Sequence, residues 1–175
     1  KILKKINNKT IHILILLLGS IFICLSIFHT SLWFDETYSV GMANHSLVDI
    51  WKIGGNDVHP VLYYWLLRIV CLITGGSILA YRIFSAIPII LLGVIGYTHI
   101  RKDFGEKTGM LFSFLALFIP ASTVYANQIR MYSWAILAVT ILAIYAYRLS
   151  KEDNTKNWII FGISSLVSIY LHYYG

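Results

Sequence analysis

The chain has 175 residues, of which 58% are hydrophobic and 13% are charged, and its formal net charge is +6 at pH 7. A soluble domain of this length needs more polar surface than this composition supplies, and the apolar residues form long blocks instead of short amphipathic periods. The positive charge does not indicate nucleic-acid binding, because the Lys and Arg residues sit in short clusters between apolar blocks, where membrane proteins carry topology signals. We therefore expect an all-α integral membrane protein, since about 20 consecutive apolar residues cross a bilayer as a helix.

Five apolar blocks predict transmembrane helices. The first block covers residues 11–30 and follows a basic segment; no small-residue cleavage site comes after it, so we predict a retained helix and not a signal peptide. The other four predicted spans cover about 83–100, 110–126, 131–147 and 158–174. We predict that the short charged segments between these spans are loops.

A shorter apolar run at 60–73 leaves two topologies open. If this run spans the bilayer, the basic residues divide evenly between the two sides. If it lies in the membrane interface, ten basic residues face the cytoplasm, and only Lys52, Arg68, Arg82 and Arg130 are external. The positive-inside rule favours the second topology. The ten cytoplasmic residues are then Lys1, Lys4, Lys5, Lys9, Arg101, Lys102, Lys107, Arg148, Lys151 and Lys156.

The second topology leaves an external loop at 31–82, in which we predict two interfacial helices at about 38–53 and 60–75. Apolar and polar positions alternate with a helical period in both segments, as expected for helices that lie along the membrane surface. Arg68 can then extend its side chain to the lipid headgroups.

This topology also gathers the unusual polar residues at the external face. Asp35 and Glu36 follow the first span; each can change the other's pKa, and one can act as a general base. The alternative is a pair of solvated carboxylates that only mark the membrane boundary. The other polar residues at this face are Asp57, His59, Arg82, Gln128, Arg130 and His172.

The basic residues of this group suit anion binding. Arg82 and Arg130 can hold a phosphate with two hydrogen bonds, or simply reach the headgroups. His59 can bind phosphate as a cation or a metal as a neutral ligand, and His172 is a further metal or acid–base candidate. Tyr132 is typical of an interface anchor. No P-loop, dinucleotide-binding glycine pattern or HExxH motif is present, so the sequence indicates neither a nucleotide site nor a zincin.

Five segments occur in a distinctive order. They are Trp33-Phe34-Asp35-Glu36, Asp57-Val58-His59-Pro60-Val61-Leu62-Tyr63-Tyr64, Tyr81-Arg82-Ile83-Phe84-Ser85-Ala86, Arg101-Lys102-Asp103-Phe104-Gly105 and Tyr125-Ala126-Asn127-Gln128-Ile129-Arg130-Met131-Tyr132. In this order and spacing the chain resembles the N-terminal module of the C superfamily of membrane glycosyltransferases (GT-C). Within it, the chain resembles the family 39-like branch of protein O-mannosyltransferases and bacterial aminoarabinose transferases. The resemblance extends from the first span to Gly175, and the C-terminal remainder of such a module is not part of this sequence.

The resemblance implies an enzyme of the bacterial cell membrane with a cytoplasmic N-terminus and an extracytoplasmic active site. The donor would be a sugar linked to polyprenyl or dolichyl phosphate, the acceptor a glycan, lipid or protein, and the outcome inversion at the anomeric carbon. By analogy, Asp35 is the general base and Glu36 supports it. The residues implied to surround the donor phosphate are His59, Arg82, Gln128, Arg130 and Tyr132.

Because the chain departs from the family pattern at two points, the identity of the donor sugar and the use of a divalent metal stay open. Val61 stands where a second Pro is common, and neither Asn127 nor Gln128 is acidic. If a metal binds, the candidate ligands are Glu36, His59 and His172. Two other functions stay open: a transporter or flippase fragment, which would place charges near the bilayer midplane, and a non-catalytic membrane subunit.

Overall fold

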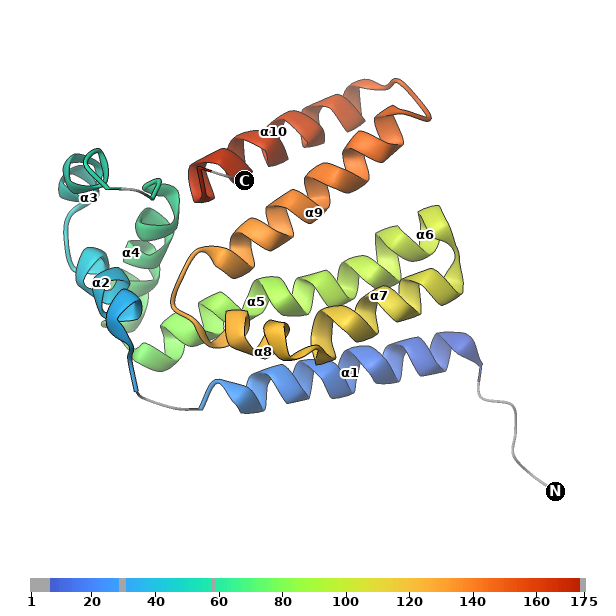
Figure 1. Cartoon of the computed structure of the whole chain (residues 1–175), viewed down its shortest axis with the longest axis horizontal. Coiled ribbons are helices and arrows are strands. Elements are labelled where there is room, and N and C mark those ends of the chain that lie inside the picture. Colours follow the sequence, from blue (N-terminus) through green and yellow to red (C-terminus); the bar gives the residue numbers. More distant parts are fainter. Residues whose placement is uncertain (1–6, 29–30, 58, 174–175) are drawn as a thin grey trace.

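The computed structural model describes residues 7–28, 31–57 and 59–173, and all regular secondary structure in these ranges is helical. Several long helices run side by side: α1 (Asn8–Ser26), α5 (Ile78–Ile95), α7 (Glu106–Phe118) and α9 (Tyr132–Leu149). α5 continues through the π-helical segment η1 (Gly96–Ile100) into α6 (Arg101–Phe104), while α10 (Thr155–Leu171) pairs with α9 (Figure 1). The short α8 (Pro120–Asn127) follows α7.

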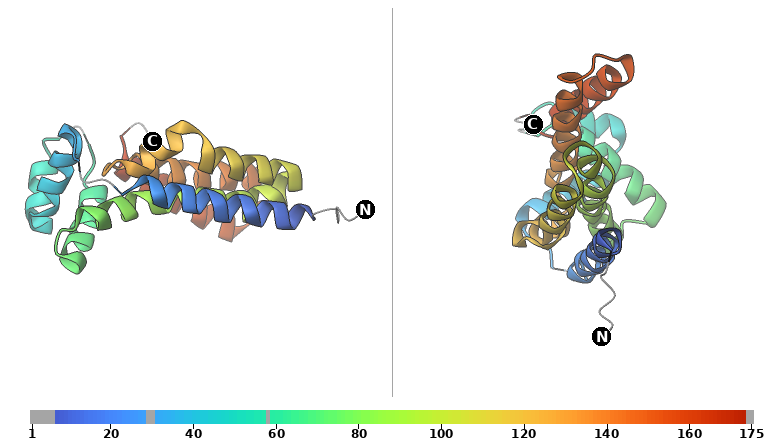
Figure 2. Two further views of the ribbon diagram at one scale, coloured as in Figure 1. Left: turned by 90° about the horizontal axis from the view of Figure 1, so that it is seen from below. Right: turned by 90° about the vertical axis from the view of Figure 1, so that its right-hand side faces the viewer.

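Three further helices form a separate group at one end of the long helices (Figures 1 and 2). They are α2 (Phe34–Ala43), α3 (Leu47–Gly54) and α4 (Leu62–Thr74), which we call the helical cap. We refer to this end of the molecule as the cap end, and to the opposite end as the far end.

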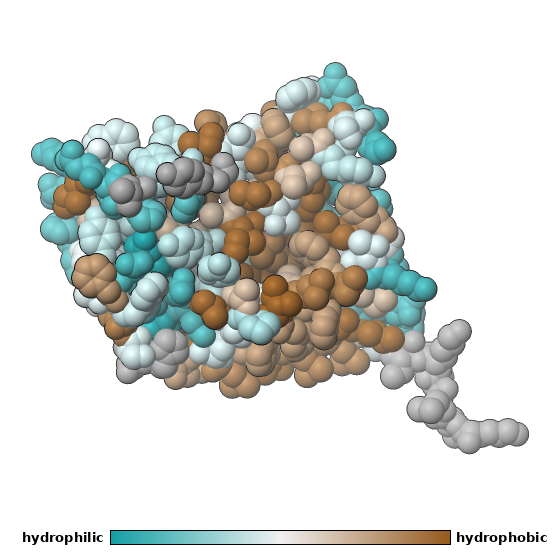
Figure 3. All heavy atoms as spheres, in the orientation of Figure 1, coloured by the Kyte–Doolittle hydropathy of each residue, from teal (hydrophilic) through white to brown (hydrophobic). Residues whose placement is uncertain are grey.

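The length and composition of the helices confirm an all-α membrane protein. Among the described residues, three helices are long and apolar enough to cross a bilayer: α1, the continuous helix Ile78–Phe104 and α9. α7 and α8 would make a fourth span if the bent pair is counted as one. Hydrophobic side chains cover the middle of the face shown in Figure 3, and hydrophilic ones gather toward the two ends. α10 has 17 residues, so the fifth span at 158–174 stays a prediction.

Local side-chain contacts explain where several helices begin. Asn7, Ser77 and Asn154 stand at the N-caps of α1, α5 and α10, and each side chain accepts a hydrogen bond from a backbone N–H of the first turn. α4 ends where Gly75 takes a left-handed conformation with φ of 69°, which glycine adopts without steric cost. These caps are short-range features and are visible in the sequence.

Two predicted helices differ from those in the structure. The single interfacial helix expected at 38–53 is two helices, because Ser46 starts α3 by accepting a hydrogen bond from Asp49 N. The span expected at 110–126 bends by 55° between α7 and α8. Pro120 lacks an N–H and forces Ile119 into an extended conformation, which ends α7.

Small residues let the long helices approach closely. A Cβ added to Gly19 or Gly93 would lie 2.7 Å from the side chain of Leu117, so both glycines provide the space in which Leu117 packs. A similar close contact joins Gly96 of η1 to Ser113 of α7. The Ser113 hydroxyl lies 2.7 Å from Nε2 of the buried His12 and donates to the Gly93 carbonyl. Close packing and buried hydrogen bonds of this kind hold membrane helices together.

Contacts between helix termini show which of them lie at the same end of the molecule. At the far end, Glu106 accepts hydrogen bonds from Asn8 and Arg101, and Asp103 accepts one from Arg148. α1 ends and α5 begins at the cap end, so the segment between them returns to the end from which it started (Figure 1). The position of α4 relative to the membrane stays a prediction.

Some sequence-based predictions lie outside the described residues. They concern Lys1, Lys4, Lys5, residues 29–30 at the end of the first predicted span, Val58, and residues 174–175.

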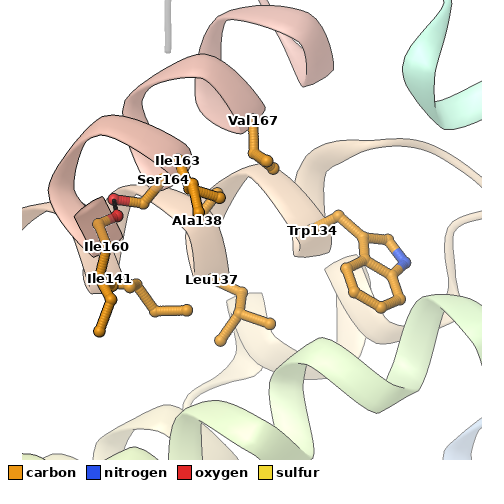
Figure 4. A pocket seen from close by; sticks show the side chains of 8 residues that line it. All are labelled: Trp134, Leu137, Ala138, Ile141, Ile160, Ile163, Ser164 and Val167. Carbon is orange, nitrogen blue, oxygen red and sulfur yellow. Dashed lines mark hydrogen bonds between the residues drawn. The ribbon is translucent and has the colours of Figure 1, made fainter. Parts of the chain in front are cut away.

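The pocket between α9 and α10 is apolar. It has a volume of about 300 Å³, and Figure 4 shows its lining side chains, which come from these two helices. Its one hydroxyl, Ser164, bonds back to carbonyls of its own helix. Trp134 at its edge donates to the Phe84 carbonyl and so ties α9 to α5. The pocket therefore offers no polar chemistry, and the candidate site lies at the cap end.

Candidate functional site

The candidate site lies where the helical cap meets the start of α5 and the connection between α8 and α9. Buried side chains from α2, α4, α5 and α9 form one apolar cluster here, which includes Met42, Tyr63, Tyr64, Tyr81 and Met131. This cluster fixes the positions of the polar groups above it.

Glu36 and Arg82 form a buried ion pair across 46 positions of sequence. Arg82 Nη1 lies 2.9 Å from Glu36 Oε1, and the two side chains are 1% and 4% exposed. Glu36 also accepts hydrogen bonds from the backbone N–H groups of Ile129, at 2.9 Å, and Trp33, at 3.2 Å. The Glu36 carboxylate therefore joins α2, α5 and the α8–α9 connection.

Arg82 also makes hydrogen bonds that stabilise the fold. Its guanidinium donates to the Ser31 carbonyl at 2.7 Å and also to the Asn127 carbonyl. The family resemblance implies that Arg82 lies beside a donor phosphate, and in this structure Arg82 joins the α1–α2 connection and the end of α8 to Glu36. It does line a pocket of about 380 Å³ together with Gln128, Glu36 and Trp33.

Arg130 is the second buried cation of the site. It is 3% exposed, and its guanidinium Nη2 lies 3.3 Å from His59 Nε2. Nη1 lies 3.4 Å from both the Asp35 carbonyl and the Ser39 hydroxyl. Nε is buried and has no hydrogen-bond partner among the described residues. Because a buried donor without a partner is costly, this face of Arg130 is suited to an anionic ligand.

His59 lies between Arg130 and an aromatic group. Its ring centroid is 5.9 Å from that of His172, which in turn is 6.1 Å from the ring of Tyr132. Burial and the positive charge of Arg130 lower the pKa of His59, although Asp57, whose carboxylate lies 3.8 Å from His59 Nδ1, opposes this shift. His59 is therefore neutral at pH 7, and a neutral ring can accept a hydrogen bond from Arg130.

Asp35 has a different environment from its neighbour Glu36. It is half-buried, and its carboxylate makes no hydrogen bond or ion pair with a described residue. Its negative charge is near enough to His59 to raise the pKa of that imidazole in part. Asp35 stands in the first turn of α2, where the helix dipole favours a carboxylate. Of the two adjacent acids, only Asp35 has a carboxylate available for a ligand.

The structure thus brings most of the predicted residues together, in two layers. Asp35, His59, Arg130, Tyr132 and His172 form the outer layer, and the Glu36–Arg82 pair lies beneath it. Gln128 lines the neighbouring pocket with Arg82. Sequence reasoning missed Tyr38, which donates to Asp57 at 3.1 Å, and Ser39. The position of Ser39, one helical turn after Asp35, was the available signal.

The predicted metal ligands do not converge. No group of three or more His, Cys, Asp or Glu residues within the described ranges is arranged to hold a metal ion. Glu36 is engaged by Arg82, so it does not join His59 and His172. Within the described ranges, these three candidate side chains are therefore not arranged around one metal ion.

Comparison with known protein families identifies the family of this chain. A family model described as dolichyl-phosphate-mannose-protein mannosyltransferase matches residues 58–174. No curated protein and no solved structure matches the chain. The matched segment includes His59, Arg82, Gln128, Arg130, Tyr132 and His172.

Proposed function

Because the chain belongs to the dolichyl-phosphate-mannose-protein mannosyltransferase family, a family of membrane glycosyltransferases that use polyprenyl-phosphate sugars, we propose that its own reaction takes place at the outer layer of the cap-end site. The observation that carries this proposal is the contrast between the two acids. Glu36 is neutralised by Arg82, whereas the Asp35 carboxylate makes no ion pair with a described residue, and the backbone carbonyl of Asp35 lies 3.4 Å from Arg130 Nη1. A carboxylate that no described cation neutralises, close to a fixed guanidinium, provides the two groups that glycosyl transfer from a phosphate requires.

In this mechanism Asp35 is the general base. It removes the proton from an acceptor hydroxyl as that oxygen forms a bond to the anomeric carbon of the donor sugar. The bond from the anomeric carbon to the phosphate oxygen breaks at the same time, and the electron pair leaves on the lipid phosphate. Direct displacement inverts the anomeric configuration.

Arg130 is the group that we propose binds the leaving phosphate. Its planar guanidinium is held by His59, Ser39 and the Asp35 carbonyl, so it needs little reorganisation as charge develops on the phosphate. Arg82 acts one layer below as a positioning residue, because it holds Glu36 and therefore the start of α2.

A groove that begins at this site supports a lipid-linked donor. It has a volume of about 370 Å³ and is lined by Tyr132 and His172, then by α9 residues that include Ile136 and Val139. Its apolar part follows α9 from the cap end toward the middle of the molecule. A prenyl chain could lie along this groove while its phosphate stays beside Arg130.

The two ends of the molecule support the proposed orientation. The basic loops after α6 and after α9 lie at the far end, and the site lies at the cap end. By the positive-inside rule the far end is cytoplasmic, so the site is extracytoplasmic. Cysteines placed at Asn56 and Lys107 in a cysteine-free background test this. An impermeant maleimide applied to intact cells should label position 56 and not 107; the reverse pattern would overturn the orientation.

The catalytic assignment is tested with the full-length protein in nanodiscs and dolichyl-phosphate mannose as the donor probe. We measure the release of dolichyl phosphate. Asp35→Asn should lower the turnover by about 10²–10⁴-fold, the typical contribution of a general base. Asp49→Asn is the matched control, because Asp49 is an exposed residue of the helical cap whose carboxylate hydrogen-bonds, among the described residues, to Ser46. Turnover by Asp35→Asn at the native rate, in a protein that turns over the probe, would remove Asp35 from the chemistry.

A further inference from the structure

The far end of the molecule carries a polar pocket that the proposed reaction does not use. It has a volume of about 460 Å³ and lies between α6, the end of α9 and the start of α10. Four cations line it, and two acids are among them. These residues are Lys102, Arg148, Lys151, Lys156, Asp103 and Glu152.

The charges of this pocket are not balanced internally. Arg148 Nε lies 2.8 Å from Asp103 Oδ2, so this pair is neutral and closes one wall. Lys102 and Lys156 are exposed and form no ion pair with a described residue, and Lys151 lies over the Tyr147 ring at 5.5 Å. Three lysines therefore face one remaining acid, Glu152, which leaves the pocket with an excess of positive charge.

Exposed aromatic residues place the pocket at the membrane boundary. The Phe104 and Trp158 side chains are 45% and 54% exposed and stand at the far end of the helices that flank the pocket. The Phe104 ring packs 4.6 Å from the Tyr147 ring, directly beside the pocket. Aromatic residues of this kind lie at the level of the lipid headgroups in membrane proteins.

From this combination we infer that the pocket binds the phosphate headgroup of an anionic phospholipid in the leaflet at the far end, with Lys102, Lys151 and Lys156 as its ligands. Basic pockets between helices at this depth suit a phosphate, since each cation adds attraction to an anionic lipid. The fixed Arg148–Asp103 pair keeps the wall of the pocket in place. A lipid bound here would hold the α6–α7 and α9–α10 connections together. The inference does not depend on the proposed function.

Native mass spectrometry of the full-length protein in detergent tests this inference. The protein is titrated with phosphatidylglycerol and, separately, with phosphatidylcholine. The pocket variant is Lys102→Gln/Lys151→Gln/Lys156→Gln. The matched control is Lys9→Gln/Lys52→Gln/Lys107→Gln, which removes the same amount of charge at three lysines that do not line the pocket.

We expect one phosphatidylglycerol to remain bound to the native protein and to the control. In the pocket variant the affinity should fall at least tenfold, because each lysine near an anionic surface contributes about fivefold. Equal losses in the two triple variants would mean that net charge alone attracts the lipid and would overturn the site. Equal binding of phosphatidylcholine would also overturn it. Displacement of the bound lipid by soluble glycerol phosphate would show that the pocket takes small phosphate anions and would refute the lipid assignment.

Discussion

The Glu36→Gln substitution separates the structural acid of the site from the chemical one. Glu36 is almost fully buried and accepts hydrogen bonds from Arg82, Ile129 N and Trp33 N. Glutamine preserves the size of the side chain but removes its charge, so the buried Arg82 guanidinium loses the carboxylate that lies 2.9 Å from its Nη1. Breaking a buried ion pair in this way costs about 3–5 kcal/mol.

That loss is large relative to the total free energy of unfolding. A folded domain is stable by about 5–15 kcal/mol, and for a chain of this size the expected fall in melting temperature is roughly 6–20 °C. The assay is thermal unfolding in detergent, followed by tryptophan fluorescence. Asp35→Asn is the isosteric control at the adjacent position. Its melting temperature should stay at the native value, because the Asp35 carboxylate makes no hydrogen bond or ion pair with a described residue.

The double variant Glu36→Gln/Arg82→Gln completes the test. Without the buried cation, it should be less destabilised than the sum of the two single variants. The reasoning is refuted if Glu36→Gln unfolds together with the native protein, or if Asp35→Asn loses as much stability as Glu36→Gln.

Three other predictions follow from the same structure. Arg130→Lys keeps the charge but loses the planar guanidinium, so the turnover with dolichyl-phosphate mannose should fall at least tenfold. Native turnover would show that charge alone suffices. The folded-state pKa of His59 is lowered, so the unfolded chain binds more protons as the pH falls through 6.5, and stability is lost on the acid side. Chemical denaturation of His59→Gln should therefore show a smaller loss of stability from pH 7 to pH 5 than the native chain, and an identical slope would contradict this. Gly96→Ala should lower the melting temperature, because its Cβ would lie 2.2 Å from Ser113 Oγ and 2.9 Å from a backbone oxygen. In the control Gly162→Ala the added Cβ meets nothing within 4 Å, so the free energy of unfolding should rise by about 0.5–1 kcal/mol. A higher melting temperature for Gly96→Ala than for Gly162→Ala would show that Gly96 and Ser113 are not in close contact.

The sequence alone determined the class of the protein and its family. Long apolar blocks require helices in a membrane, because every backbone polar group must be satisfied inside the segment. The family resemblance depended on short motifs with fixed spacing, and the family match over residues 58–174 confirms it. Capping residues such as Ser77 and Asn154, and the break at Pro120, are also local, so the helix boundaries that they set can be read from the chain.

The division of roles between Asp35 and Glu36 came from tertiary structure. The two acids are adjacent in sequence, and composition treats them alike. One residue of a helix turns the side chain by about 100°, so Glu36 points toward α5 while Asp35 faces the outer layer. The partner that neutralises Glu36 is 46 positions away, and no local pattern links the two.

The same limit applies to the other predicted ligands. Arg82 and Arg130 are equivalent as sequence features, yet one is engaged by a carboxylate and two carbonyls, and the other keeps a buried N–H without a described partner. Hydrophobicity and capping act over a few residues and can be read from the sequence. Which buried charge is compensated depends on contacts between segments far apart in the chain, so only the folded structure decides it.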